Sequence, residues 1–303
     1  MHLTASSPAH TASRTRAGWI NGAIGMVLFS ASLPATRLAV LQLDPLFLTF
    51  ARATVAGLLG LAALVALRER RPGRADLGPL AVTSAGVVVG FPLLTALALR
   101  HVTAAHALVF VALLPLATAA FAVLRDGERP RPAFWAFAGA GAATVCGYAL
   151  SRAGGESSWT GDLAMVAAIL FCGLGYAEGG RLSRRLGGWQ VISWALVLAL
   201  PLMLPLALVW APASWSGIGA PAWFGLAYVS LFSMLVGFVF WYRGLALGGT
   251  AAVGQLQLVQ PVLGLGLASA LLHEQVDATM VLAAAGAVLC VAGVRRFASP
   301  TRR

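Results

Sequence analysis

The sequence predicts an all-α, polytopic membrane protein whose ten transmembrane helices form two inverted five-helix repeats. Three observations lead to this fold class. The 303-residue chain is 59% hydrophobic and 10% charged, whereas soluble domains carry roughly 25% charged residues. Long apolar runs with the length of membrane-spanning helices follow one another along the chain. One pattern of proline, glutamate and glycine occurs in both halves.

The apolar runs are separated by short connections and show no amphipathic stripe, as expected for helices surrounded by lipid. About 20 apolar residues are needed to cross the hydrocarbon core of a bilayer. Ten runs meet this length, at residues 18–37, 45–67, 77–99, 102–124, 132–151, 161–180, 189–210, 221–242, 249–272 and 278–295. Residues 1–17 are rich in Ser, Thr and Ala and are expected to form a cytoplasmic tail.

The arginines predict the orientation of the spans, because basic residues concentrate in cytoplasmic loops. All 21 basic residues are arginines. If the N-terminus is cytoplasmic, seventeen lie on the inner side, three lie on the outer side, and Arg52 lies within a span. We therefore expect both termini in the cytoplasm of a bacterium and the chain in its inner (plasma) membrane. The net charge of +11 does not indicate nucleic-acid binding, because the arginines form no basic face with interleaved aromatic residues.

The repeat is visible as a proline, a glutamate thirteen residues later and a glycine nineteen residues further on. The two copies are Pro115, Glu128 and Gly147 in the first half and Pro261, Glu274 and Gly293 in the second. They are separated by 146 residues, which is five spans. Because five is odd, the second copy crosses the membrane in the opposite direction, a plan that recurs in secondary transporters.

Four stretches carry a resemblance to a known family. They are DPLFLTFARATVAGLLGL (44–61), LLPLATAAFAVLRDGERP (113–130), VQPVLGLGLASALLHEQ (259–275) and GAVLCVAGVR (286–295). Over nearly its whole length the chain resembles the EamA-type members of the drug/metabolite transporter superfamily, although it has LLHEQ where LLGEx is commoner.

The resemblance implies one five-helix repeat at 18–151 and another at 161–296, around a central cavity. It implies a secondary transporter that moves a small metabolite or drug-like solute by alternating access. Amino acids or related amphiphiles are candidate solutes and export is the expected direction, while the sequence itself identifies neither the solute nor the direction.

Two prolines near mid-span, Pro115 and Pro261, remove a backbone donor and are expected to interrupt their helices. Paired interruptions at matching positions point to a binding region, and we interpret both prolines as hinges, together with Gly264 and Gly266. The alternative is a packing kink without contact to solute. The spacings in GVVVG (86–90) and GLALG (244–248) are typical of close helix packing.

Polar side chains within the spans are the candidates for solute binding. Arg52 could attract an anionic group, or it could extend toward the membrane surface or join helices. The resemblance places spans 1, 3, 4, 6, 8 and 9 around the cavity, which gives the candidates Ser32, Thr95, His106, Phe110, Tyr176, Ser233, Gln257 and Gln260. Hydrogen bonding between helices is the alternative role for each of them.

The source of energy for transport is left open by the sequence. The acidic residues of the spans lie near span ends, and His106 is the one mid-span histidine. Proton coupling, facilitated diffusion and exchange therefore carry equal weight. We expect no metal and no cofactor, because Cys146, Cys172 and Cys290 show no ligand spacing.

An integral-membrane enzyme and a non-transporting membrane sensor are the rival classes. Neither HExxH nor GxSxG occurs, and no second domain accompanies the spans. The expected partners are a small-molecule solute and the lipid bilayer, with the chain as a monomer or a homodimer.

Overall fold

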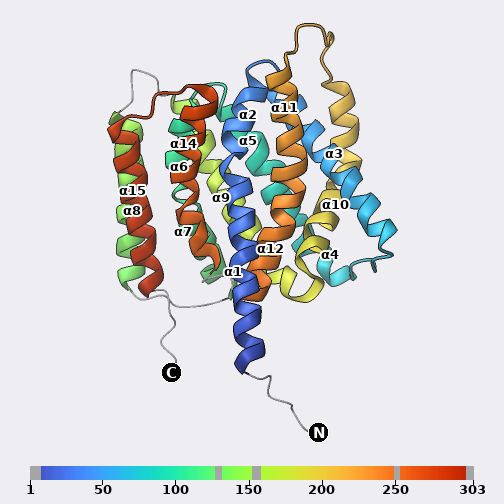
Figure 1. The fold of residues 1–303 in the computed structure, drawn as a ribbon, viewed down its shortest axis with the longest axis horizontal. Helices are drawn as coiled ribbons and strands as arrows, with labels where there is room; N and C mark the ends of the chain where they lie inside the picture. Colours follow the sequence, from blue (N-terminus) through green and yellow to red (C-terminus); the bar gives the residue numbers. More distant parts are fainter. Residues whose placement is uncertain (1–7, 127–131, 152–157, 249–252, 298–303) are drawn as a thin grey trace.

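The computed structural model describes residues 8–126, 132–151, 158–248 and 253–297, and the regular secondary structure of these ranges is entirely helical (Figure 1). Seven helical stretches are long and apolar enough to cross a membrane: Thr15–Val40, Pro45–Ala66, Arg74–Ala98, Ala104–Leu124, Trp159–Leu186, Gly188–Val209 and Ala220–Gly248. Three shorter apolar stretches lie where the fifth, ninth and tenth spans are predicted, at Trp135–Val145, Leu256–Leu272 and Ala278–Cys290. The prediction of an all-helical protein is confirmed for the described residues, and these stretches have the length and composition of membrane spans.

Five of the apolar stretches are continuous helices, namely α3 (Pro45–Ala66), α8 (Pro132–Ser151), α9 (Trp159–Leu186), α10 (Gly188–Val209) and α15 (Ala278–Phe297). The other five are divided. Three of them consist of two pieces: α1 (Pro8–Ser30) with α2 (Ser32–Val40), α6 (Ala104–Val111) with α7 (Leu114–Asp126), and the 3₁₀-helix η3 (Gly254–Leu258) with α14 (Gln260–Leu272). The other two have a π-helix in the middle. They are α4 (Arg74–Thr83), η1 (Ser84–Gly90) and α5 (Phe91–Ala98), and α11 (Ala220–Tyr228), η2 (Val229–Val236) and α12 (Gly237–Gly248).

Three boundaries differ by six residues or more from those expected, one of them the end of α12 at Gly248 rather than at 242. Helix α1 begins at Pro8, so residues 8–17 of the expected tail are helical, and the first turns of α1 project beyond the other helices in Figure 1. Helix α9 continues past the predicted end at 180 to Leu186. Arginines in its last turn favour this extension, because cations interact well with a helix C-terminus.

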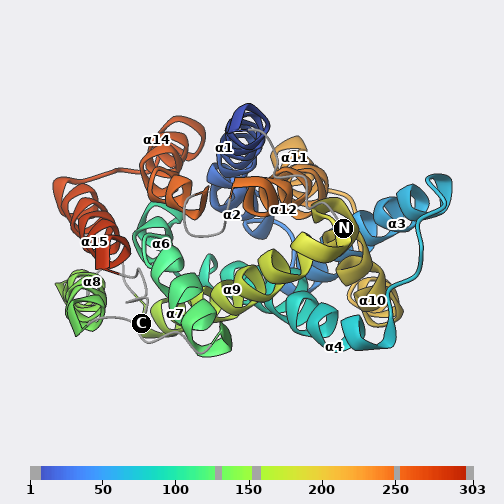
Figure 2. The same ribbon diagram turned by 90° about the horizontal axis from the view of Figure 1, so that it is seen from below.

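Helix pairs from the two halves of the chain form the edges of the bundle. Seen from below, α3 and α10 lie side by side at one edge, and α8 and α15 at the opposite edge (Figure 2). Between them, α1 packs on α12, and α9 packs on η1, α5 and α7. Helix α1 begins and α15 ends at one end of the bundle, which we call the terminal end (Figure 1). The other end, where α6 and α9 begin, is the far end.

The α1–α12 contact is formed by glycines. A Cβ atom on Gly244 would lie 2.6 Å from the backbone nitrogen of Gly22, and one on Gly18 would lie 2.5 Å from that of Gly248. On the other side of the bundle, a Cβ on Gly86 would lie 2.6 Å from the carbonyl oxygen of Phe171. Both small-residue motifs therefore lie at close helix contacts, as predicted.

Gly244→Ala is expected to destabilise the protein by about 1–3 kcal/mol, because the new methyl group would force the backbones of α1 and α12 apart. The matched control is Gly139→Ala in α8, where a Cβ atom would meet nothing within 4 Å. The measurement is thermal unfolding of the purified protein in detergent. Equal midpoints for the two variants would contradict the close packing of α1 on α12.

Candidate functional site

Three predicted residues meet in one buried hydrogen-bonded chain. Nη2 of Arg52 donates to Oγ of Ser233 at 3.3 Å, and this hydroxyl lies 2.7 Å from Oγ of Ser32. The arginine side chain is only 3% exposed, so it does not extend to the membrane surface. The chain joins α3, η2 and α2. The position of Arg52 in α3 depends on where this helix begins. The carboxylate of Asp44 accepts from two backbone N–H groups and fixes that start.

The π-helix η2 places Ser233 in this chain. A π-helix is wider than an α-helix, so it changes the direction of its side chains, and short segments of this kind are frequent at functional sites. Its counterpart η1 begins 145 residues earlier, close to the repeat offset of 146. Both halves therefore carry a π-helical segment at the same point of the repeat, and no sequence pattern predicted either segment.

Several buried polar atoms have no hydrogen-bond partner in the described structure. They include Nε of Arg52, Nε1 of Trp241, Nε2 of Gln257 and Oε1 of Gln260, all of them in predicted or family-implied spans. An unsatisfied buried polar group costs about 1–3 kcal/mol, and each such group in a folded protein calls for an explanation. A solute that hydrogen-bonds to these atoms would remove the cost. Trp241 was not among the predicted site residues.

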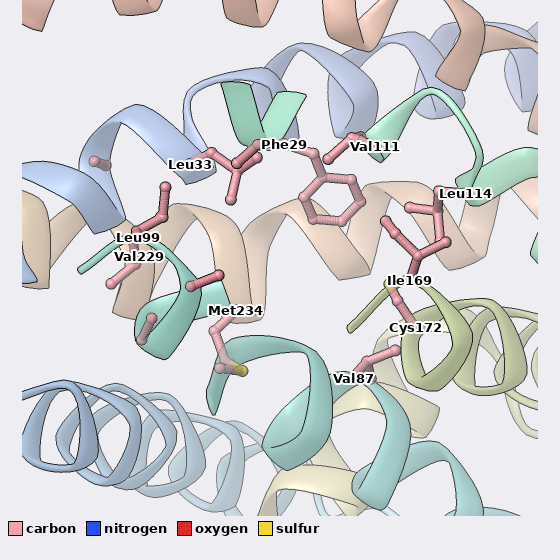
Figure 3. Packing of buried hydrophobic residues seen from close by; sticks show 14 of the residues in the cluster. Phe29, Leu33, Val87, Leu99, Val111, Leu114, Ile169, Cys172, Val229 and Met234 are labelled. Atoms are coloured by element: carbon pink, nitrogen blue, oxygen red, sulfur yellow. The ribbon is translucent and has the colours of Figure 1, made fainter. Parts of the chain in front are cut away.

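An aromatic cluster includes Trp241 and is centred on Tyr176. The ring of Tyr176 lies 5.8 Å from the rings of Phe238 and Trp241 and 6.3 Å from that of Phe29. Tyr176 also interacts with Gln257, which connects the cluster to the polar atoms. Figure 3 shows that Phe29 belongs to a buried apolar cluster with side chains of α6, α7, α9, η1 and η2. Gln257 thus interacts with an aromatic ring at the border of this cluster.

His106 belongs to a different group of residues. Its Nε2 lies 2.6 Å from Oδ1 of Asp162, and its Nδ1 lies 3.0 Å from the hydroxyl of Tyr148. The ring of Phe110 is 5.6 Å from the imidazole. Sequence reasoning placed His106 in the cavity and missed both partners, because they lie 56 and 42 residues away along the chain.

The second glutamate of the repeated motif caps a helix at the far end. The carboxylate of Glu274 accepts from the backbone N–H groups of Ala104 and Ala105 at 3.0 and 2.8 Å. It also lies 4.0 Å from Nε of Arg37, whose guanidinium donates to the carbonyl of Leu99. Glu274 thereby connects α14 to the start of α6 and to α2. Glu128, the first glutamate of the motif, lies outside the described residues.

The two prolines lie directly after interruptions of their helices. Helix α6 ends at Val111, and Pro115 is in the first turn of α7; η3 ends at Leu258, and Pro261 is in the first turn of α14. The interruptions at 112–113 and 259 again differ by about the repeat offset. Proline suits a first helical turn because its missing N–H has no intrahelical acceptor there.

The remaining candidates occupy less suggestive positions. A Cβ atom on Gly264 would lie 2.4 Å from the side chain of Leu108, whereas Gly266 is exposed with nothing near it. The hydroxyl of Thr95 donates within its own helix to the carbonyl of Phe91 at 2.7 Å. Thr95 is therefore not part of the Arg52 chain.

A groove of about 300 Å³ lies elsewhere, between α4 and α10. Most of its lining is apolar, and it consists of Arg71, Pro72, Leu77, Leu80, Trp194, Val197, Leu198 and Pro201. None of the candidate residues lines it, so the groove gives no support to the site.

A family model described as the EamA-like transporter family matches residues 16–150 and again residues 159–296. The chain belongs to the EamA-like transporter family. The Arg52 chain of hydrogen bonds therefore joins the two matched units, since Ser32 and Arg52 lie in the first and Ser233 lies in the second.

Relatives of this EamA-like chain are also named as transporters. It is 63% identical over 94% of its length to the "Uncharacterized transporter YdeK" of Bacillus subtilis (strain 168), of which it covers 99%. It is 29% identical over 78% of its length to a "Probable terminal-alkyne amino-acid exporter" of Streptantibioticus cattleyicolor (strain ATCC 35852 / DSM 46488 / JCM 4925 / NBRC 14057 / NRRL 8057), of which it covers 80%. A solved crystal structure with 23% identity superimposes with a TM-score of 0.65 over 93% of this chain and 98% of that one, a likeness of fold.

Proposed function

We propose that this protein is a secondary transporter that exports a small amphiphilic solute with an anionic group across a bacterial inner membrane. The observation that carries the proposal is the junction of the two family units. There, Arg52 of the first unit donates to Ser233 of the second, and one buried polar atom each of Arg52, Trp241, Gln257 and Gln260 has no hydrogen-bond partner. Trp241 belongs to the aromatic cluster around Tyr176, and Gln257 interacts with that tyrosine.

The anionic group of the solute binds Arg52. A guanidinium pairs well with a carboxylate because its planar set of donors matches both oxygens. The hydroxyls of Ser32 and Ser233 and the amides of Gln257 and Gln260 supply further hydrogen bonds, while the aromatic cluster holds the apolar part. An amino acid with a large side chain has this chemistry, and the name of the Streptantibioticus relative supports the same class.

Ten spans form two inverted five-helix repeats in this proposal. The two matches of the family model support the duplication, and the π-helices and helix interruptions recur at nearly the same offset in both halves. The duplicated unit holds an odd number of spans, so the copies cross the membrane in opposite directions. Alternating access then arises from rocking of the two halves about one central site.

In this proposal the described conformation is closed at the far end. The burial pattern supports this, because every residue of α6 is buried, whereas residues 116 and 118–122 of α7 are half-exposed. The contacts of Glu274 with α6 and Arg37 support this closure. With the terminal end in the cytoplasm, the solute would enter the site from the cytoplasm.

The orientation can be checked by cysteine labelling in a variant without Cys146, Cys172 and Cys290. Ser216→Cys, in the exposed connection between α10 and α11 at the far end, is expected to react with an impermeant maleimide added to intact cells. Arg70→Cys, in the exposed connection between α3 and α4, is expected to react only after the cells are opened. The reverse pattern, or two cysteines on one side, would contradict the ten-span model.

Transport itself is tested with the purified protein in liposomes. Liposomes loaded with an unlabelled amino acid are expected to take up the same labelled amino acid faster than protein-free liposomes, because a carrier exchanges solute across the membrane. A screen of amino acids with aromatic or long aliphatic side chains identifies the solute. If neither these nor neutral and cationic drug-like solutes exchange, the proposed transport function is wrong.

A further inference from the structure

A buried group of titratable residues at the far end has no part in the proposed solute site. His106 of α6 lies between Asp162 in the first turn of α9 and Tyr148 of α8, at 2.6 and 3.0 Å. The three residues are between 3% and 5% exposed. Ionisable side chains buried to this extent in a membrane-spanning region are costly and are commonly functional.

The hydrogen bonds of this group can accommodate two states of protonation. With the carboxylate of Asp162 ionised, Nε2 of His106 carries a proton and donates to it. In the neutral imidazole, Nδ1 accepts from the Tyr148 hydroxyl; when Nδ1 gains a proton, it donates to the same oxygen. Because the phenol can be donor or acceptor, the group can bind one proton more without any displacement of its heavy atoms.

The surroundings of α6 contain further charges. The start of the helix is capped by Glu274, which lies near Arg37, so these two largely compensate each other. The charged and titratable groups at this end are Arg37 of α2, Arg100 and His101 before α6, Tyr148 of α8, Asp162 of α9, His273 and Glu274 after α14, and Asp277 before α15. Of these, the described contacts place Asp162 and Tyr148 on the imidazole itself.

The His106–Asp162 contact joins the two halves of the transporter. His106 lies in the first matched unit of the family model and Asp162 in the second. Opening of the far end requires these halves to separate at this contact. A stronger His106–Asp162 contact therefore makes the open conformation less populated. Histidine is the side chain that ordinarily changes its charge between about pH 5 and 8.

We propose that His106 and Asp162 form the proton-binding site of the transporter, and that protonation of His106 closes the far end. The inference rests on the proposed transport function. A proton from the far side binds Nδ1 of His106, and no other covalent bond forms or breaks. The resulting imidazolium–carboxylate pair attracts the two halves more strongly than the neutral ring does. As the pH rises, the proton leaves and the far end opens more often.

The first test follows closure directly and needs no solute. In a variant without its native cysteines, the buried Ala107→Cys beside His106 is labelled by an impermeant maleimide at several pH values. Its rate is divided by that of the exposed Ser216→Cys, which corrects for the part of the pH dependence that the two thiols share. This ratio is expected to rise about threefold to tenfold between about pH 5 and 8, because a charge-assisted hydrogen bond is roughly twice as strong as a neutral one.

Substitutions decide whether this pH dependence belongs to the pair. His106→Gln and Asp162→Asn are expected to abolish it. His101→Gln is the matched control, since His101 is exposed at the same end of the bundle and is expected to leave the rise intact. If His106→Gln keeps the pH response of the parent protein, or if the parent shows no response, the proposal is wrong.

The second test measures coupling in liposomes. For the unsubstituted protein, a higher proton concentration on the far side than on the terminal side is expected to drive solute toward the far side. In His106→Gln, the ratio of gradient-driven flux to exchange at equal pH is expected to fall about tenfold, because the variant cannot bind the proton. If the unsubstituted protein exchanges solute but shows no gradient-driven flux, the proposed proton site is wrong and the proposed transport function stands. Absence of exchange overturns the transporter, while the labelling test still decides the proton site.

Discussion

Arg52→Gln is expected to lower transport of an anionic solute at least a hundredfold. The guanidinium is buried, has one hydrogen bond to Ser233 and leaves Nε unpaired, so its remaining donors are available to a carboxylate. Removing one partner of a buried charge pair costs about 3–5 kcal/mol, which corresponds to a factor of a hundred or more. Uptake into liposomes at equal amounts of inserted protein measures the loss.

Two comparisons separate solute binding from helix packing. Arg52→Lys keeps the charge without the planar donors and is expected to lose roughly tenfold. A solute analogue in which an amide replaces the carboxylate is expected to be affected less by Arg52→Gln than the carboxylate itself. Arg70→Gln, in an exposed connection, is the control. If Arg52→Gln transports both solutes normally at normal abundance, the arginine only joins α3 to η2.

The helical class and the approximate positions of the spans were predictable because hydropathy acts locally. Each apolar stretch of about 20 residues specifies a helix wherever its neighbours lie. The matched prolines also located the interruptions of two helices. The boundary of α9 was less predictable, because its last turns are polar and are stabilised by contacts such as Glu178 with Arg181 at 2.6 Å.

The arrangement of the site was not predictable in the same way. Ser32, Arg52 and Ser233 were each candidates, but the hydrogen bond between the two serines joins residues 201 positions apart. No local pattern encodes such a contact. The π-helices were missed for a related reason, since their sequences, SAGVVVG and VSLFSMLV, have no feature that distinguishes them from α-helix.

Asp162 shows how position along a span can mislead. The sequence places it near a span end, where a carboxylate is ordinarily solvated. In the fold, α6 begins beside α9, so His106 covers the carboxylate and both side chains are buried. The order of residues within each span therefore does not distinguish proton coupling from facilitated diffusion or exchange. The contact between His106 and Asp162, which joins two spans, favours a proton site.

The two prolines provide the remaining prediction, which concerns the conformational equilibrium. Pro115 cannot donate to the carbonyl of Val111, and Pro261 cannot donate to that of Gln257, so each interruption lacks one helical hydrogen bond. Alanine would supply the missing N–H at either position. One restored hydrogen bond stabilises the continuous helix by about 0.5–1.5 kcal/mol, or roughly twofold to tenfold in the population of the straighter conformation.

If the halves are inverted copies, the same chemical change must act on opposite faces of the membrane. Pro115→Ala and Pro261→Ala are therefore expected to shift the labelling of Ala107→Cys, near the far end, in opposite directions, so that the two variants differ by up to about a hundredfold. The half-exposed Ala120→Cys, toward the terminal end, is expected to respond with the reverse sign. Pro201→Ala is the control, because α10 continues through that proline without interruption. Shifts of the same sign in both variants would show that the prolines are not equivalent hinges of inverted repeats. In inverted repeats, the same substitution in the two copies acts at opposite faces of the membrane.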